Sequence, residues 1–188
     1  MLLLVAIVLS VVAVPLTGGR LSRLANVRLR LVPAIFAALL IQVVITSVAS
    51  DGGWIDRVLY LLSYCLAGWF LVANRKIPGM WVVAAGTSLN ALAIAANNGV
   101  MPASRSALRT AGLATSSHGF ANSTLLLHPR LLLLGDVLAV PASLPLHNVY
   151  SVGDVCILIG AVIAIHMLCR VKVEEHSELP SPDMSTSR

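Results

Sequence analysis

The sequence predicts an all-α protein, a polytopic transmembrane bundle of five helical spans, and three observations carry this prediction. Of the 188 residues, 57% are hydrophobic and only 11% are charged, whereas soluble domains carry about 25% charged residues. The mean hydropathy is +0.88. The apolar residues are gathered into long segments separated by short polar turns. Because a helix needs roughly 20 apolar residues to cross the hydrocarbon core, these segments are candidate spans.

The five predicted spans follow the apolar segments in chain order. They are residues 1–17, 31–49, 54–73, 80–96 and 152–169. Gly18 and Gly19 end the first span. Pro33 is tolerated in the first turn of the second span, where no backbone donor is lost. Trp54 and Trp69, near the two ends of the third span, have the placement of interfacial aromatic anchors.

Small residues in the last two spans predict close helix packing. Gly79, Gly86 and Ala93 recur every seven residues along the fourth span. Gly160 and Ala164 form a small-xxx-small pair in the fifth. Small side chains let two membrane helices approach closely, so each of these spans is expected to press its small-residue face against a neighbour.

The chain between the fourth and fifth spans is predicted to be a long extracytoplasmic loop, residues 97–151. Within it, residues 131–140 are apolar but too short to cross the bilayer. We expect this segment to be re-entrant or interfacial, with other helices burying its backbone wherever it enters the membrane. Residues 1–170 are then a single transmembrane domain. Residues 171–188, polar and containing proline and serine, are predicted to be a disordered cytoplasmic tail.

The distribution of Lys and Arg predicts the orientation. Basic residues follow the first, third and fifth predicted spans, and none follows the second. With five spans, all the basic sites lie on one side, which the positive-inside rule makes cytoplasmic. The amino terminus is then outside. The net charge of +5 is therefore explained by the membrane orientation. Because the basic residues form no basic face, the charge does not indicate a nucleic-acid partner. The expected partner is the lipid bilayer.

Asp136 and Asp154 are the candidate catalytic residues. Both lie in apolar surroundings, where an ionised carboxylate is costly unless it is paired or used. Two carboxylates brought close together share one proton, so that one can accept a proton from water while the other polarises a carbonyl. A peptide bond at the membrane surface is a suitable target. The alternative for Asp154 is a capping box with Ser151 at the start of the fifth span, and Asp136 after Gly135 is also compatible with a plain turn.

Other polar residues give weaker candidates for binding. Asn90 and Asn97 form one polar stripe on the fourth span, explained either by hydrogen bonds between helices or by contact with a substrate. Asn98, which precedes Gly99, belongs either to the site or to a turn. Arg130 and Ser151 complete the set because they lie close to the aspartates in sequence.

No metal site or cofactor is predicted. The histidines outside the tail lack metal-ligand spacing and are expected to be surface or interface residues: His118, His128, His147 and His166. Cys65, Cys156 and Cys169 lie in apolar segments, where thiols act as small hydrophobic groups, so no disulfide is predicted either.

Three short segments resemble motifs of a known enzyme family. The segment from Tyr150 to Ala161, with Asp154 ahead of an Ile-rich helix, resembles the last motif of lipoprotein signal peptidases, the type II signal peptidases. Gly135-Asp136-Val-Leu is similar to that family's other catalytic segment, and Asn98-Gly99 to its Asn-x-Gly element. The resemblance implies that Asp136 and Asp154 form the dyad of an outward-opening membrane aspartyl peptidase, with a membrane-bound protein or lipoprotein as substrate.

Over residues 1–170 the chain resembles a bacterial family of small polytopic membrane proteins of unknown function. The shared elements are Gly18-Gly19-Arg20, Leu89-Asn90, an Asn-Asn-Gly-Val-Met-Pro segment over residues 97–102, and the two Gly-Asp pairs. This resemblance implies a bacterial cytoplasmic membrane and no particular activity. Function therefore stays open between an aspartyl-type membrane hydrolase, a non-catalytic accessory or binding subunit, and a small transporter. The last is disfavoured because no ionisable residue falls in the middle of a span and no inverted repeat is present.

Overall fold

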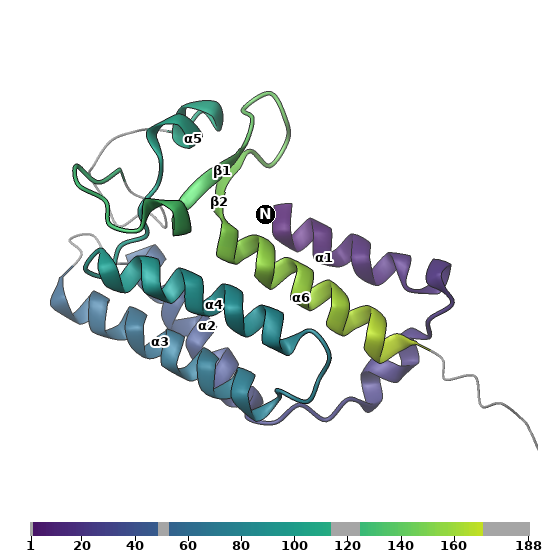
Figure 1. The fold of residues 1–188 in the computed structure, drawn as a ribbon. Helices are drawn as coiled ribbons and strands as arrows, with labels where there is room; N and C mark the ends of the chain where they lie inside the picture. The colour runs from purple at the N-terminus through teal and green to yellow at the C-terminus, as the bar shows by residue number, and fades with distance from the viewer. Residues whose placement is uncertain (1, 49–52, 114–124, 171–188) are drawn as a thin grey trace, which may run out of the picture.

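The computed structural model describes residues 2–48, 53–113 and 125–170. Within them, five long helices pack side by side and a small cap covers one end of the bundle (Figure 1). The long helices are α1 (Leu2–Ala13), α2 (Val32–Val48), α3 (Trp54–Ala73), α4 (Met80–Ala96) and α6 (Val152–Cys169). The cap consists of α5 (Arg105–Thr110), the 3-10 helix η3 (Leu132–Leu134), β1 (Asp136–Val140) and β2 (Asn148–Ser151). Two further 3-10 helices, η1 (Pro15–Thr17) and η2 (Leu21–Asn26), lead from α1 towards α2.

The contacts between helix ends fix the direction of each helix. The Arg20 N–H donates to the Cys169 carbonyl at 2.9 Å, so α1 and α6 finish at the same end of the bundle. The side chain of Asn74 bonds to the backbone of Arg30, so α3 finishes where α2 begins. We call this the basic end, defined by Arg20, Arg23, Arg28, Arg30, Arg75, Lys76 and Arg170. The opposite end, which carries α5 and the two strands, is the cap end.

Glycines bring α4 and α6 into backbone contact. A Cβ added at Gly86 would lie 2.9 Å from Cβ of Cys156. A Cβ at Gly160 would lie 2.7 Å from the Val83 nitrogen and 2.8 Å from the Gly79 carbonyl oxygen. A side chain at either position would overlap with these atoms and push the two helices apart. The close packing predicted from these small residues is therefore confirmed.

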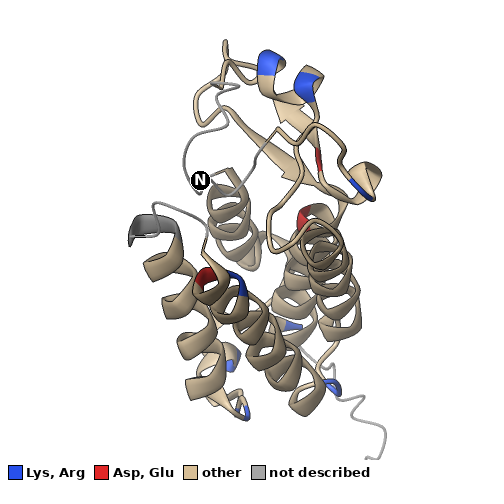
Figure 2. Cartoon of the chain, turned by 90° about the vertical axis from the view of Figure 1, so that its left-hand side faces the viewer, with Lys and Arg blue, Asp and Glu red and all other residues tan. Residues whose placement is uncertain are grey.

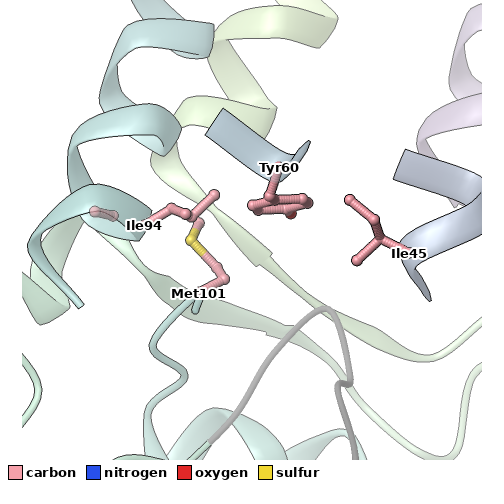
Figure 3. Close-up of a cluster of buried hydrophobic side chains, with 5 residues drawn as sticks. Ile45, Tyr60, Ile94 and Met101 are labelled. Atoms are coloured by element: carbon pink, nitrogen blue, oxygen red, sulfur yellow. The ribbon is translucent and has the colours of Figure 1, made fainter. Parts of the chain in front are cut away.

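A buried cluster joins the bundle to the cap. Ile45, Tyr60, Ile94 and Met101 pack together with Ala93 (Figure 3). They come from α2, α3, α4 and the chain after α4, and Leu134 of η3 packs against them. Burial of this apolar surface ties the cap to three helices of the bundle.

The cap contains a β-hairpin that the sequence analysis did not predict. β1 and β2 are antiparallel, with Asp136 opposite Ser151, Leu138 opposite Tyr150, and a bulge between Asp136 and Leu138. Val149 packs against the helix α5 in a small separate core. Residues 131–140, the segment predicted to be re-entrant or interfacial, contain η3 and β1. The all-α prediction is wrong here because the pairing partner of this apolar run lies beyond a proline-containing loop, and a distant partner leaves no local periodicity.

The outer surface of the bundle is strongly apolar. Large apolar side chains are exposed on every long helix, while the described Lys, Arg and Asp residues lie near helix ends and in the cap (Figure 2). Among the described residues, α3 and α6 are long and apolar enough to cross a membrane. Helices α1, α2 and α4 are apolar but shorter. Apolar surface on this scale is unusual for a soluble monomer.

Two predictions fall outside the described part of the chain. They are the tail over residues 171–188 and the surface position of His118.

Candidate functional site

Asp154 lies in the first turn of α6 and forms the capping box that the sequence offered as the alternative to a catalytic role. The Asp154 N–H donates to Ser151 Oγ at 2.9 Å. In return, the Ser151 N–H donates to Asp154 Oδ2 at 3.0 Å. These reciprocal bonds satisfy backbone donors that a helix start leaves without partners. Capping therefore accounts for one oxygen of the Asp154 carboxylate.

Asn90 of α4 occupies the other oxygen. Its Nδ2 donates to Asp154 Oδ1 at 2.8 Å, and its Oδ1 accepts a hydrogen bond from Ser151 Oγ at 2.7 Å. Asn90 is only 5% exposed and Ser151 is fully buried. A Cβ at Gly153 would lie 2.7 Å from Cγ of Asn90, so glycine there makes room for the amide. Asn90, Ser151 and the half-buried Asp154 thus form one hydrogen-bonded network between α4 and α6.

Asp136, the first residue of β1, is held next to this network. Its N–H donates to the Pro102 carbonyl at 2.9 Å, and its carbonyl accepts from the Ser104 N–H at 3.0 Å. On its other side it stands opposite Ser151 in the hairpin register. Asp136 is 4% exposed. Both aspartates are therefore neighbours of Ser151 at the cap end, Asp154 through the helix cap and Asp136 through the hairpin register.

Two tyrosines of α3 complete the surroundings, and the sequence analysis missed both. The rings of Tyr60 and Tyr64 meet edge to face, with centroids 5.6 Å apart, and the side chains are hydrogen-bonded to each other. Asp136 and Asp154 both lie within electrostatic range of these two side chains. The available signal was their spacing: two tyrosines four residues apart share one face of a helix, and a buried phenol needs a polar partner.

Tyr150 has a buried hydroxyl close to the hairpin end. It lies in β2 next to Ser151 and is buried. Within the described ranges, its Oη has no hydrogen-bond partner. A buried hydroxyl without a partner costs about 1–3 kcal/mol, so each such group calls for an explanation. A bound water or ligand at this position would supply the partner.

The remaining predicted binding residues lie apart from the aspartates. The Asn97 amide donates to the carbonyls of Ala93 and Arg130, both at 2.7 Å, and accepts from the Arg130 N–H at 2.8 Å. Asn97 therefore holds the chain before η3 against the end of α4. Asn98 is exposed with φ of +57° and, with Gly99, forms the turn after α4. The side chain of Arg130 is exposed.

The histidines lie away from the network. His128 and His147 are exposed, and His166 approaches Thr17 Oγ1 at 3.2 Å near the basic end. Among the residues that the structure describes, no three His, Cys, Asp or Glu side chains are grouped to hold a metal ion.

Comparison with known proteins supports the wider of the two resemblances. The model of a family described as "Family of unknown function (DUF5317)" matches residues 26–166, a range that includes Asn90, Asp136 and Asp154. No curated protein and no solved structure matches the chain. The expected relationship to a family of unknown function is thereby confirmed.

Proposed function

The chain belongs to the family of unknown function DUF5317, and we propose that it is a five-span protein of the bacterial cytoplasmic membrane with an outward-facing aspartate-pair site. The helix directions support five spans, since successive long helices run in alternate directions and α1 begins on the side of the cap (Figure 1). A 12-residue α1 rises only about 18 Å. Local thinning of the bilayer and the continuation through η1 accommodate such a short span.

The charges support the orientation. Seven basic residues define the basic end, whereas Arg57, Arg105, Arg109 and Arg130 lie at the cap end. The described acids, Asp56, Asp136 and Asp154, lie at the starts of α3, β1 and α6, which are at the cap end. By the positive-inside rule, the basic end faces the cytoplasm and the cap faces outwards.

The chemistry we propose is hydrolysis by the two carboxylates. The half-buried Asp154 takes a proton from a water molecule whose oxygen attacks the carbonyl carbon of a peptide bond. The more buried Asp136 gives its proton to the carbonyl oxygen. The carbon–nitrogen bond then breaks, Asp154 passes its proton to the leaving amine, and a hydroxyl of the tetrahedral intermediate returns a proton to Asp136.

One observation carries this proposal: Asp136 stands opposite Ser151 in the hairpin. Ser151 in turn bonds to Asp154 through the Ser151 N–H and the Ser151 hydroxyl. The hairpin and the cap of α6 thereby hold two acids around a single serine. The local resemblance to lipoprotein signal peptidases points to the same pair, with a membrane-bound protein or lipoprotein as substrate.

A second candidate is a non-catalytic accessory subunit whose cap docks a partner. The observation that favours it is the engagement of both Asp154 oxygens by Asn90 and Ser151. Because both oxygens already accept hydrogen bonds within the fold, Asp154 can serve to stabilise the start of α6 without taking part in a reaction.

Single substitutions separate the two candidates. We would express wild type, Asp136→Asn, Asp154→Asn and Asp56→Asn in cells lacking the native gene and profile the amino termini of all membrane proteins by mass spectrometry. Asp56 is the matched control because it caps α3 in the same way that Asp154 caps α6. The hydrolase predicts cleaved termini that depend on Asp136 and Asp154 but not on Asp56. Identical profiles in all four strains, with the proteins inserted equally, would leave the accessory role.

A further inference from the structure

The basic end carries a second feature, separate from the aspartates. Three contacts gather its cations from different parts of the chain. Arg20 bonds through its N–H to the end of α6, Arg23 Nη1 donates to the Arg170 carbonyl, and Arg30 is held by Asn74 at the end of α3. The loop from α1 to α2 is therefore folded against the ends of α3 and α6. Cations from three separate segments share one surface.

This surface is not neutralised by the described acids. Asp56, Asp136 and Asp154 all lie at the cap end, which is the opposite end of the bundle from these cations. At the basic end, every cation except the half-buried Arg23 is exposed. Their charges therefore add to a positive potential over the end of the bundle, which favours an anionic partner.

Exposed tryptophans give the depth of this surface in the bilayer. Trp69, in the last turns of α3, is 59% exposed, and Trp81, in the first turn of α4, is 66% exposed. Tryptophan is enriched at the level of the lipid headgroups. The exposed Leu21 and Leu29 lie beside the arginines of the same loop. Apolar and basic residues together are typical of a segment that lies in the interface plane, with its cations at the phosphates.

We propose that the basic end binds the headgroups of anionic phospholipids in the cytoplasmic leaflet. A guanidinium group matches a phosphate with two parallel hydrogen bonds, and several Lys and Arg next to membrane helices attract negatively charged lipids. In a zwitterionic lipid the choline ammonium offsets the phosphate charge, so an anionic lipid such as phosphatidylglycerol is the better ligand. The inference rests on the bilayer location in the proposed function and not on the aspartate pair.

The test measures how added lipid changes the thermal stability of the full chain in a neutral detergent. Tryptophan fluorescence during heating gives the Tm. Phosphatidylglycerol should raise Tm more than phosphatidylcholine does, because a ligand that binds only the folded state stabilises it. High salt should reduce the difference. The double variant Arg20→Gln/Arg28→Gln should lose most of the phosphatidylglycerol shift. The matched variant Arg105→Gln/Arg109→Gln, with the same charge change at the cap end, should keep it.

Several results would overturn the proposal: equal shifts with both lipids, an unchanged shift in Arg20→Gln/Arg28→Gln, equal losses in the two double variants, or the same shift with glycerol phosphate alone. If the glutamine variant does not fold, Arg20→Lys/Arg28→Lys retains the charge and should retain the preference for phosphatidylglycerol. Asp136→Asn should leave the lipid response unchanged, so failure of the aspartate site and failure of the lipid site are distinguishable.

Discussion

The two helices of membrane length, α3 and α6, begin in the same way and in very different surroundings. In α3, Asp56 Oδ2 accepts the Gly53 N–H at 3.1 Å. In α6, Asp154 Oδ2 accepts the Ser151 N–H at 3.0 Å. At α3 the hydrogen bonding of the cap stops at this one bond, because Gly53 has no side chain that could accept the Asp56 N–H. The start of α6 continues through the Ser151 hydroxyl into the buried amide of Asn90.

The difference shows how much of the α6 terminus goes beyond capping. One carboxylate oxygen and one backbone N–H are enough to cap α3. At α6, a buried amide, a buried hydroxyl and a second acid in the facing strand are added to the same cap. Each of these groups loses hydration on burial, and hydrogen bonds within the protein must offset this cost in free energy. A terminus that only had to start a helix would not need them.

The buried asparagines sharpen the same contrast. Asn74 and Asn97 each bond to the N–H and carbonyl of an arginine, Arg30 and Arg130 respectively. Both therefore hold a loop against a helix end through backbone groups. Asn90 instead bonds to two side chains, from Ser151 and Asp154. An asparagine that anchors backbone is structural, whereas one that orients a carboxylate is placed for chemistry or for a specific buried network.

The largest expected effect comes from separating α6 from α4. In Gly86→Leu, the new side chain meets the backbone of Gly153 and the side chain of Cys156, so we expect a loss of about 3 kcal/mol or more in the free energy of unfolding. Gly68→Leu on α3 is the matched control, because a Cβ there meets nothing within 4 Å. Thermal unfolding in detergent measures both. Equal stability of the two variants would refute the close α4–α6 contact.

The next effect tests the buried network directly. Asn90→Ala removes the partner of Asp154 Oδ1 and of the Ser151 hydroxyl. Leaving buried polar groups without partners should lower the free energy of unfolding by about 1–3 kcal/mol. Asn98→Gly, at an exposed position with positive φ, should change it little. A loss in Asn90→Ala no larger than in Asn98→Gly would mean that the network does not stabilise α6.

A smaller effect compares the caps themselves. Ser151→Ala removes the hydroxyl that accepts the Asp154 N–H and should cost about 1–2 kcal/mol. Gly53→Ala should cost only a fraction of about 1 kcal/mol, because Gly53 caps α3 without a side chain and its φ of −61° suits alanine. Urea unfolding of both variants gives the comparison. If the two losses were the same, the start of α6 would be no more than an ordinary helix start.

The sequence was informative where a single helix decides the structure. The predicted spans 54–73, 80–96 and 152–169 coincide with α3, α4 and α6, because apolar length and flanking turns are local signals. The capping box at Asp154 and the contacts of Gly86 and Gly160 were predictable for the same reason. These features need no knowledge of distant partners.

The hairpin and the tyrosines were not predictable in this way. β1 pairs with a strand beyond residues 141–147, and its apolar composition gives no strand periodicity. Tyr60 and Tyr64 are apolar enough to pass as ordinary members of a span, so their relation to Asp136 and Asp154 emerges only when α3 packs beneath the cap. The convergence of the aspartates likewise depends on the hairpin register rather than on any motif.

The smallest expected effect on stability concerns Tyr150. Tyr150→Phe removes a buried hydroxyl that has no partner among the described residues, so the free energy of unfolding should stay unchanged or rise by less than about 1 kcal/mol. Tyr60→Phe is the control: its hydroxyl is hydrogen-bonded to Tyr64, and its loss should cost about 1 kcal/mol. A destabilisation equal to that of Tyr60→Phe would assign the Tyr150 hydroxyl to the hydrogen bonding of the fold and remove it from the argument for a ligand.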